Sequence, residues 1–294
     1  MQIILLAAGT IALYSVSTLL IKAYQLKSGA GAIPLAFMNL ISGNAVFLFF
    51  FLFCGFHFRF TPLSLSLSVL YGMMLWAYIA LKVSAAKDGP LAIVSLAYVA
   101  GGVLVPALFG FVFLDEPVTF IKTISFVLII SSFVPLIIRQ KSSMVFSFHF
   151  GFQCLMILLL NGVMICISKI VQLYSPEEYA IDYVALTFFF YYLAAIGIFG
   201  TKLPQISPNT FKSLFSGKSI IFASGIGLFN AAGSVFNYML AGKMPASVQF
   251  PLVQSSLLVT VTVSSLFLFQ EKPHYLTIIS ILTTILGIII LTFS

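Results

Sequence analysis

The chain has 294 residues, of which 61% are hydrophobic and only 7% are charged. Soluble domains carry about 25% charged residues, so this sequence is excluded from the soluble globular class. The net charge of +7 comes from lysines and arginines that stand singly between apolar runs. That spacing is typical of membrane loops and argues against a nucleic-acid partner.

Long uninterrupted apolar runs predict membrane-spanning α-helices, because a transmembrane β-barrel requires alternating polarity. With about 20 apolar residues for one crossing, the first half of the chain holds five spans, near 2–24, 31–54, 62–85, 90–114 and 118–138. After the polar stretch 139–143, the second half holds five more, near 149–173, 179–200, 218–240, 245–269 and 275–293. The expected fold is an all-α membrane protein with ten transmembrane helices. The segment Thr201 to Lys218 is predicted to be a surface loop.

The two halves of the chain resemble each other. A shift of 155 residues aligns three pairs without a gap, namely Gly72 with Gly227, Pro90 with Pro245 and Glu116 with Glu271. A shift of 147 residues aligns 22–28 with 169–175, and both segments contain Lys, Gln, Leu and Ser at the same places. Chance similarity between apolar segments is the alternative, which the shared polar residues disfavour. Because five is an odd number of spans, we expect two inverted five-helix repeats, residues 1–141 and 142–294.

The order of these motifs resembles the drug/metabolite transporter superfamily in its ten-span, EamA-like type. Asp88-Gly89-Pro90 opens the fourth span and Phe113-Leu114-Asp115-Glu116 closes it, and the second copy runs from Met244-Pro245 to Phe269-Gln270-Glu271. Lys22 after the first span also resembles the family pattern. The resemblance implies a transporter whose cavity is lined by the third, fourth, eighth and ninth spans. The second copy departs from the pattern, since Val261 stands at the position equivalent to Pro106.

The orientation in the membrane is open between two readings. Ten lysines and arginines fall on the side opposite the termini and four on the side of the termini, which favours termini outside the cell. That count treats Lys82, Lys122 and Lys169 as residues of loops or span ends. The family resemblance implies termini in the cytoplasm instead. Either way, we expect a multi-pass protein of a bacterial cytoplasmic membrane.

Catalytic and metal-binding patterns are missing from the sequence. His57, His149 and His274 lie at loops or span ends, and there is no Gly-rich phosphate loop with a lysine. We therefore expect no enzyme activity, no metal and no cofactor. The first span contains no acidic residue, which disfavours proton-coupled export of cations. Asp182 is interpreted as an acid at the N-terminus of a helix near the membrane surface.

A midplane site would have to be built from neutral and aromatic side chains: Asn39, Tyr71, Trp76, Tyr78, Tyr98, Asn161, Asn230, Asn237, Gln249 and Gln254. Since the family resemblance points to four particular spans, the predicted substrate-binding residues are Trp76, Tyr98, Asn230, Asn237 and Gln254. For each residue the alternative is a hydrogen bond between helices.

The repeat also suggests two gating pairs. Lys22 and Glu271 should lie at one face of the membrane, and Lys169 and Glu116 at the other. If each pair forms and breaks as the halves rock, each closes one face. The alternative is that the lysines snorkel and the acids act independently at the interface.

The expected function is that of a secondary transporter for a small polar metabolite, such as an amino acid or a similar solute. It would act by alternating access in the lipid bilayer, as a monomer or a homodimer. The alternatives are a component of a lipid-linked sugar flippase, an intramembrane transferase and a non-transporting accessory subunit.

Overall fold

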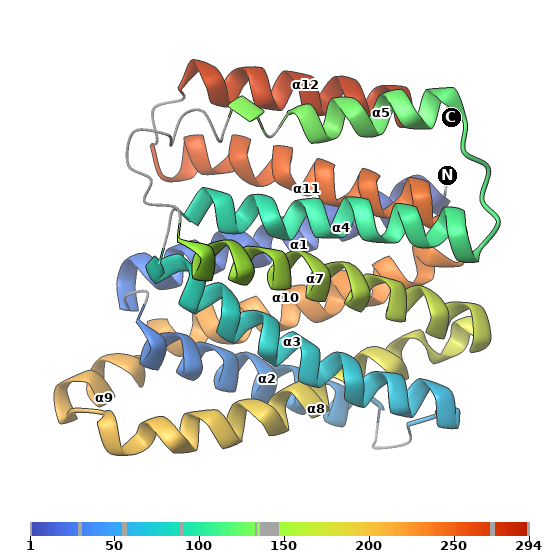
Figure 1. Cartoon of the computed structure of the whole chain (residues 1–294). Helices are drawn as coiled ribbons and strands as arrows, with labels where there is room; N and C mark the ends of the chain where they lie inside the picture. The colour runs from blue at the N-terminus through green and yellow to red at the C-terminus, as the bar shows by residue number, and fades with distance from the viewer. Residues whose placement is uncertain are drawn as a thin grey trace. The chain divides into compact units, whose positions relative to one another are not determined.

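The computed structural model describes residues 2–28, 31–54, 58–88, 91–132, 134–135, 147–270 and 274–292. Throughout these residues the regular structure is helical (Figure 1). The longer helices are α1 (Gln2–Ser28), α2 (Ala32–Cys54), α3 (Pro62–Asp88), α4 (Leu91–Phe113), α5 (Phe120–Ser131), α7 (Phe148–Tyr174), α8 (Ala180–Lys202), α10 (Gly217–Ala241), α11 (Ala246–Leu268) and α12 (Tyr275–Thr292). The chain is therefore an all-α protein, as predicted.

Seven of the described helices are long and apolar enough to cross a membrane: α1, α2, α3, α7, α8, α10 and α11. The protein is thus an integral, multi-pass membrane protein. The apolar parts of α4, α5 and α12 that the structure describes are shorter, Ala97–Phe113, Phe120–Ser131 and Ile278–Leu291. Each of the ten predicted spans overlaps one of these ten helices. Helix α5 ends at Ser131 and residues 134–135 are again helical, whereas residues 133 and 136–138 of the predicted span lie outside the described residues.

The segment predicted as a surface loop contains a short helix, so that prediction was wrong in part. Helix α9 (Pro208–Leu214) begins after Ser207, whose hydroxyl accepts a hydrogen bond from the Thr210 amide. Proline at the first helical position is favourable because its missing N–H is not needed there. Leu214 is fully buried against Phe37 and Phe199, which explains why the segment is ordered as a helix.

Packing contacts divide the chain into two compact units that differ from its two sequence halves. Unit 1 comprises Met1–Ala77 and Ile170–Gly242, and unit 2 comprises Tyr78–Lys169 and Lys243–Ser294. In unit 1, α10 packs against α1, α2 and α8, and α2 packs against α8. In unit 2, α11 packs against α4 and α12, and α5 packs against α12. Each unit therefore combines helices from both halves of the sequence.

Small residues let α10 approach its neighbours closely in unit 1. Ala223 and Ala231 are buried, and a Cβ added to Gly227 between them would collide with the Ser42 carbonyl of α2. The Ser42 hydroxyl donates to the Ala223 carbonyl at 2.7 Å, and Ser17 of α1 donates to another α10 carbonyl at 2.9 Å. In an apolar environment such close packing and interhelical hydrogen bonds replace the hydrophobic driving force.

Several local features recur 155 positions apart. Asp115 has φ 50° and Gln270 has φ 53°, and these are the non-glycine residues with positive φ in the described part of the chain. The turns before them match as well, since Leu114 N donates to Gly110 O at 3.2 Å and Phe269 N donates to Ser265 O at 3.0 Å. Non-glycine residues adopt this backbone conformation only rarely, so its recurrence at equivalent positions is informative.

The helix contact made by Gly227 also has a counterpart. A Cβ added to Gly72 of α3 would lie 2.9 Å from the Thr187 carbonyl oxygen of α8 and 2.8 Å from Phe190 Cβ. The shift of 155 relates Gly72 to Gly227, and the shift of 147 carries Ser42 to Phe189, inside the same stretch of α8. Two glycines 155 positions apart therefore each lie close to the backbone of another helix, Gly72 of α3 to α8 and Gly227 of α10 to α2.

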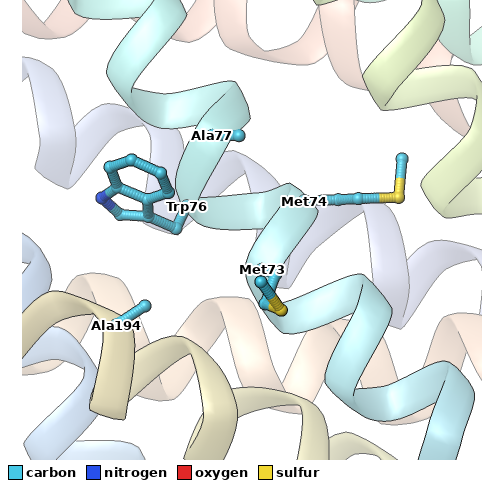
Figure 2. A pocket seen from close by; sticks show the side chains of 5 residues that line it. All are labelled: Met73, Met74, Trp76, Ala77 and Ala194. Atoms are coloured by element: carbon cyan, nitrogen blue, oxygen red, sulfur yellow. The ribbon is translucent and has the colours of Figure 1, made fainter.

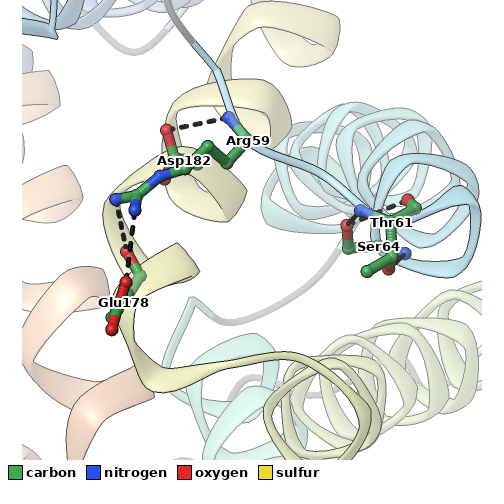
Figure 3. A network of polar contacts seen from close by, with 5 residues as sticks. All are labelled: Arg59, Thr61, Ser64, Glu178 and Asp182. Atoms are coloured by element: carbon green, nitrogen blue, oxygen red, sulfur yellow. Dashed lines mark hydrogen bonds and ion pairs between the residues drawn. The ribbon is translucent and has the colours of Figure 1, made fainter.

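An ion pair links the segment just before α3 to the start of α8 within unit 1 (Figure 3). Arg59 bonds the Asp182 carboxylate through its main-chain N–H at 3.3 Å and faces it with Nε at 3.5 Å. Its guanidinium also reaches Glu178 at 3.2 Å. Asp182 lies in the first turn of α8, where an acid was predicted, and a carboxylate there is favoured by the helix dipole.

Candidate functional site

The carboxylate of Glu116 caps the N-terminus of α11. Ala246 N donates to Oε1 at 2.6 Å and Ser247 N donates to Oε2 at 2.8 Å. The N-cap residue of α11 is Pro245, which offers no side-chain acceptor. The first amides of a helix have no partner within the helix, so a carboxylate from another part of the chain satisfies both of them.

Two buried lysines lie beside the same first turn of α11. Lys122 donates from Nζ to the Pro117 carbonyl at 3.1 Å and to the Ser247 hydroxyl at 3.3 Å. Lys169 donates from Nζ to the Met244 carbonyl at 3.1 Å and is attracted electrostatically by the Glu116 carboxylate. The structure therefore brings together Lys169 and Glu116, one of the two predicted gating pairs. It describes Lys22 in α1, whereas Glu271 lies outside the described residues.

Three lysines counted as loop charges lie within helices, which corrects the basis of the orientation count. Lys122 and Lys169 are 4% and 6% exposed, in α5 and α7. Lys82 is partly buried in α3, which continues past it as far as Asp88. All three also lie inside the predicted spans 62–85, 118–138 and 149–173, so they do not belong in a count of loop charges.

A polar and aromatic cluster in unit 2 surrounds Lys82, and we call Tyr78, Lys82, Tyr98, Asn161 and Gln254 the Lys82 cluster. Tyr78 and Lys82 lie one turn apart on α3, and the Tyr78 and Tyr98 ring centroids are 5.5 Å apart. Lys82 Nζ lies over both rings, 5.7 Å from the Tyr78 centroid and 5.3 Å from the Tyr98 centroid. Both contacts fall within the range of cation–π attraction.

Three further helices complete the Lys82 cluster. Asn161 of α7 donates to the Tyr98 carbonyl of α4 at 2.8 Å. A Cβ added to Gly102, one turn after Tyr98, would lie 2.9 Å from both Asn161 Nδ2 and Gln254 Cγ. Gln254 of α11 lies beside the Tyr98 side chain, is 7% exposed, and its Oε1 has no hydrogen-bond partner among the described residues. The glycine thus leaves room for two amides.

The five predicted binding residues do not all belong to the same compact unit. Tyr98 and Gln254 meet in unit 2, whereas Trp76, Asn230 and Asn237 belong to unit 1. Asn230 and Asn237 lie two turns apart on α10, each partly buried. Their assignment to one binding site stays a prediction.

Trp76 lines an apolar pocket of about 320 Å³ in unit 1, together with Met73, Met74, Ala77 and Ala194. Figure 2 shows the indole and Ala194 on the same side of α3, while Met74 points to the other side. The lining carries no charged or amide group, so it offers apolar contact rather than polar recognition.

Sequence reasoning overlooked Lys82 as a candidate for the site. The residue lies inside the predicted span 62–85, four positions after Tyr78, which places both on one helical face. That spacing was visible in the sequence. The proximity of Tyr98 and Gln254 was not, because it depends on how α4 and α11 pack.

No family model matches the sequence, and no curated protein matches it either. The fold does match solved structures. One of them, a crystal structure of a protein 16% identical in sequence, superposes with a TM-score of 0.74 over 98% of this chain and 96% of its own. At this level of identity the match establishes a shared fold over the whole chain.

Proposed function

We propose that the protein is a secondary transporter that moves a small polar metabolite across the membrane by alternating access. In this proposal the chain crosses the membrane ten times, as two inverted five-helix repeats of the drug/metabolite transporter type. The membrane is the cytoplasmic membrane of a bacterium. Inverted repeats are the usual framework of secondary transporters, because exchanging the conformations of the two copies exposes one site to opposite sides in turn.

The observation that carries the proposal is the recurrence of local structure at positions 155 residues apart. Asp115 and Gln270 share a rare backbone conformation 155 positions apart, and Gly72 and Gly227 make equivalent helix contacts. The packing pairs follow the same rule, because α2 packs on α8, α4 on α11 and α5 on α12, each helix with its own counterpart. These matched contacts support the repeat over chance similarity between apolar segments.

The polar groups of the Lys82 cluster support a polar solute. Charged and amide side chains inside transmembrane segments are costly and mark sites of function more often than sites of packing. In unit 2 such groups come from α3, α7 and α11, and α4 adds the phenol of Tyr98. A pathway for apolar compounds would not require them.

Counterflow in liposomes tests the proposal. Purified protein is reconstituted, loaded with one unlabelled solute at a time, and screened for uptake of labelled amino acids, amines, nucleosides and sugars. We expect transient accumulation of one class, absent from protein-free liposomes. Folded protein that exchanges none of them would refute transport of small metabolites and favour the accessory-subunit alternative.

Charge reversal tests the gating part of the proposal. We expect Lys22→Glu or Glu271→Lys alone to abolish counterflow, and the double variant to restore it. The pair Lys169→Glu and Glu116→Lys provides the corresponding test at the opposite face. If neither double variant recovers activity while all variants remain folded, the charges do not act as gates.

A further inference from the structure

Lys82, which is partly buried, differs in its surroundings from the two buried lysines of unit 2, Lys122 and Lys169. Lys122 and Lys169 each donate to a main-chain carbonyl, and both lie near the turn capped by Glu116. For Lys82, the contacts recorded in the described part of the chain are the faces of Tyr78 and Tyr98. The ion pairs recorded there involve Arg59 and His149 instead. The ammonium group of Lys82 is therefore left without a described oxygen acceptor.

Ring faces alone compensate a buried ammonium group poorly. A cation–π contact contributes about 0.5–2 kcal/mol, whereas the effective penalty for taking an ion out of water is several kcal/mol. Snorkelling is limited, because Lys82 lies six residues before the end of α3 at Asp88, roughly 9 Å along the helix axis. An anion placed beside Nζ would supply the missing charge.

A second polar atom in the cluster also lacks a partner. Gln254 Oε1 is buried and accepts no hydrogen bond from the described residues, although its side chain lies beside Tyr98. An orphaned buried acceptor costs about 1–3 kcal/mol. A ligand with an N–H or O–H group would satisfy it. The cluster thus offers a cation and an acceptor within one small group of side chains.

We propose that the Lys82 cluster binds the anionic end of the transported solute, so that the substrate class is a small organic anion that also carries an N–H or O–H donor. Lys82 Nζ holds the carboxylate or phosphate, Gln254 Oε1 accepts from the donor, and the rings of Tyr78 and Tyr98 form the walls. This inference rests on the proposed transport function.

The proposed repeat indicates that the fold itself does not require this cation. The position equivalent to Lys82 in the second copy, 155 residues later, is occupied by Asn237 on α10. An uncharged amide therefore suits the equivalent place on the equivalent helix. The charge at Lys82 is an addition in one copy, as expected for a group that recognises a ligand.

Binding to the purified full-length protein in detergent tests the inference separately from transport. The labelled probes are acetate, lactate, L-serine, glycerol 3-phosphate, glucose and choline. We expect affinity for at least one anion or zwitterion that carries a donor, and no affinity for glucose or choline. Comparison of lactate with glycerol 3-phosphate distinguishes a carboxylate from a phosphate site.

Variants assign the binding to the cluster. Lys82→Gln should weaken binding about 10- to 100-fold, as expected for losing a hydrogen bond to a charged group, whereas Lys82→Arg should weaken it less. Gln254→Leu should weaken lactate more than acetate, since acetate has no donor. Lys212→Gln removes the same charge from the exposed face of α9 and should leave binding unchanged.

The outcomes separate the two proposals. Anion binding that depends on Lys82, without counterflow of any anion, would leave the site standing and refute transport. Counterflow of a neutral or cationic solute that is unaffected by Lys82→Gln would refute the site and leave transport standing. If Lys82→Gln does not fold, Lys82→Arg and Gln254→Leu decide, and equal binding by both variants and the wild type overturns the inference.

Discussion

Replacing Glu116 tests whether one carboxylate secures the start of α11. The variant Glu116→Ala removes both acceptors, so the amides of Ala246 and Ser247 lose bonds of 2.6 and 2.8 Å. Pro245 at the N-cap supplies no substitute. From the contribution of charge-assisted hydrogen bonds and of N-caps, the expected loss of stability is about 2–4 kcal/mol. Glu116→Gln keeps one acceptor and should cost about half as much.

Thermal unfolding in detergent measures this loss. For a chain of this size, 1 kcal/mol corresponds to roughly 2–4 °C, so Glu116→Ala should unfold roughly 4–16 °C below the wild type. Asp115→Asn is the matched control, because it removes the same charge from the preceding, exposed residue and keeps a side chain that tolerates positive φ. Equal unfolding temperatures for Glu116→Ala and Asp115→Asn would refute the capping role.

Two further predictions concern helix packing and the ion pair at the start of α8. Gly227→Ala should lower the unfolding temperature through a collision with α2, by about 1–3 kcal/mol, whereas Gly197→Ala, which meets nothing within 4 Å, should be neutral or slightly stabilising; equal effects would contradict the close approach. Arg59→Gln leaves the Asp182 carboxylate, whose side chain is 7% exposed, without its partner, and should cost about 1–3 kcal/mol in denaturant unfolding. Glu178→Gln removes an exposed partner of Arg59 instead and should cost at most about 1 kcal/mol. A larger loss of stability for Glu178→Gln than for Arg59→Gln would contradict Asp182 as the more important partner.

The helices were readable from the sequence because apolar length alone identifies a segment that can cross a membrane. Their ends were less readable. Helix α3, for example, continues past the predicted end at residue 85 to Asp88. Helix α9 was overlooked because the prolines and lysines of the segment Thr201 to Lys218 are typical of a loop, and only the burial of Leu214 shows why it folds.

The sequence supplied polar candidates for the site but not their grouping. Tyr98 and Gln254 lie beside each other in unit 2, and Trp76, Asn230 and Asn237 belong to unit 1. Their role in binding stays a prediction. Residue type and depth in the membrane suggest which side chains are polar candidates. Which of them meet depends on helix packing, which a single sequence does not encode in any local pattern.

The composition of the two compact units has a consequence for biosynthesis. Ser17 of α1 bonds to Ile226 of α10, 209 residues later in the chain, and the contacts between α4 and α11 also join the two halves. Contacts so distant in sequence form late, since the intervening chain must first be made and inserted. Helices α1 and α2 must therefore stay inserted in the bilayer through their own hydrophobicity until α10 has been made and inserted. Expressed as separate fragments, 1–141 and 142–294 would each insert, but neither would contain a complete unit until the two met.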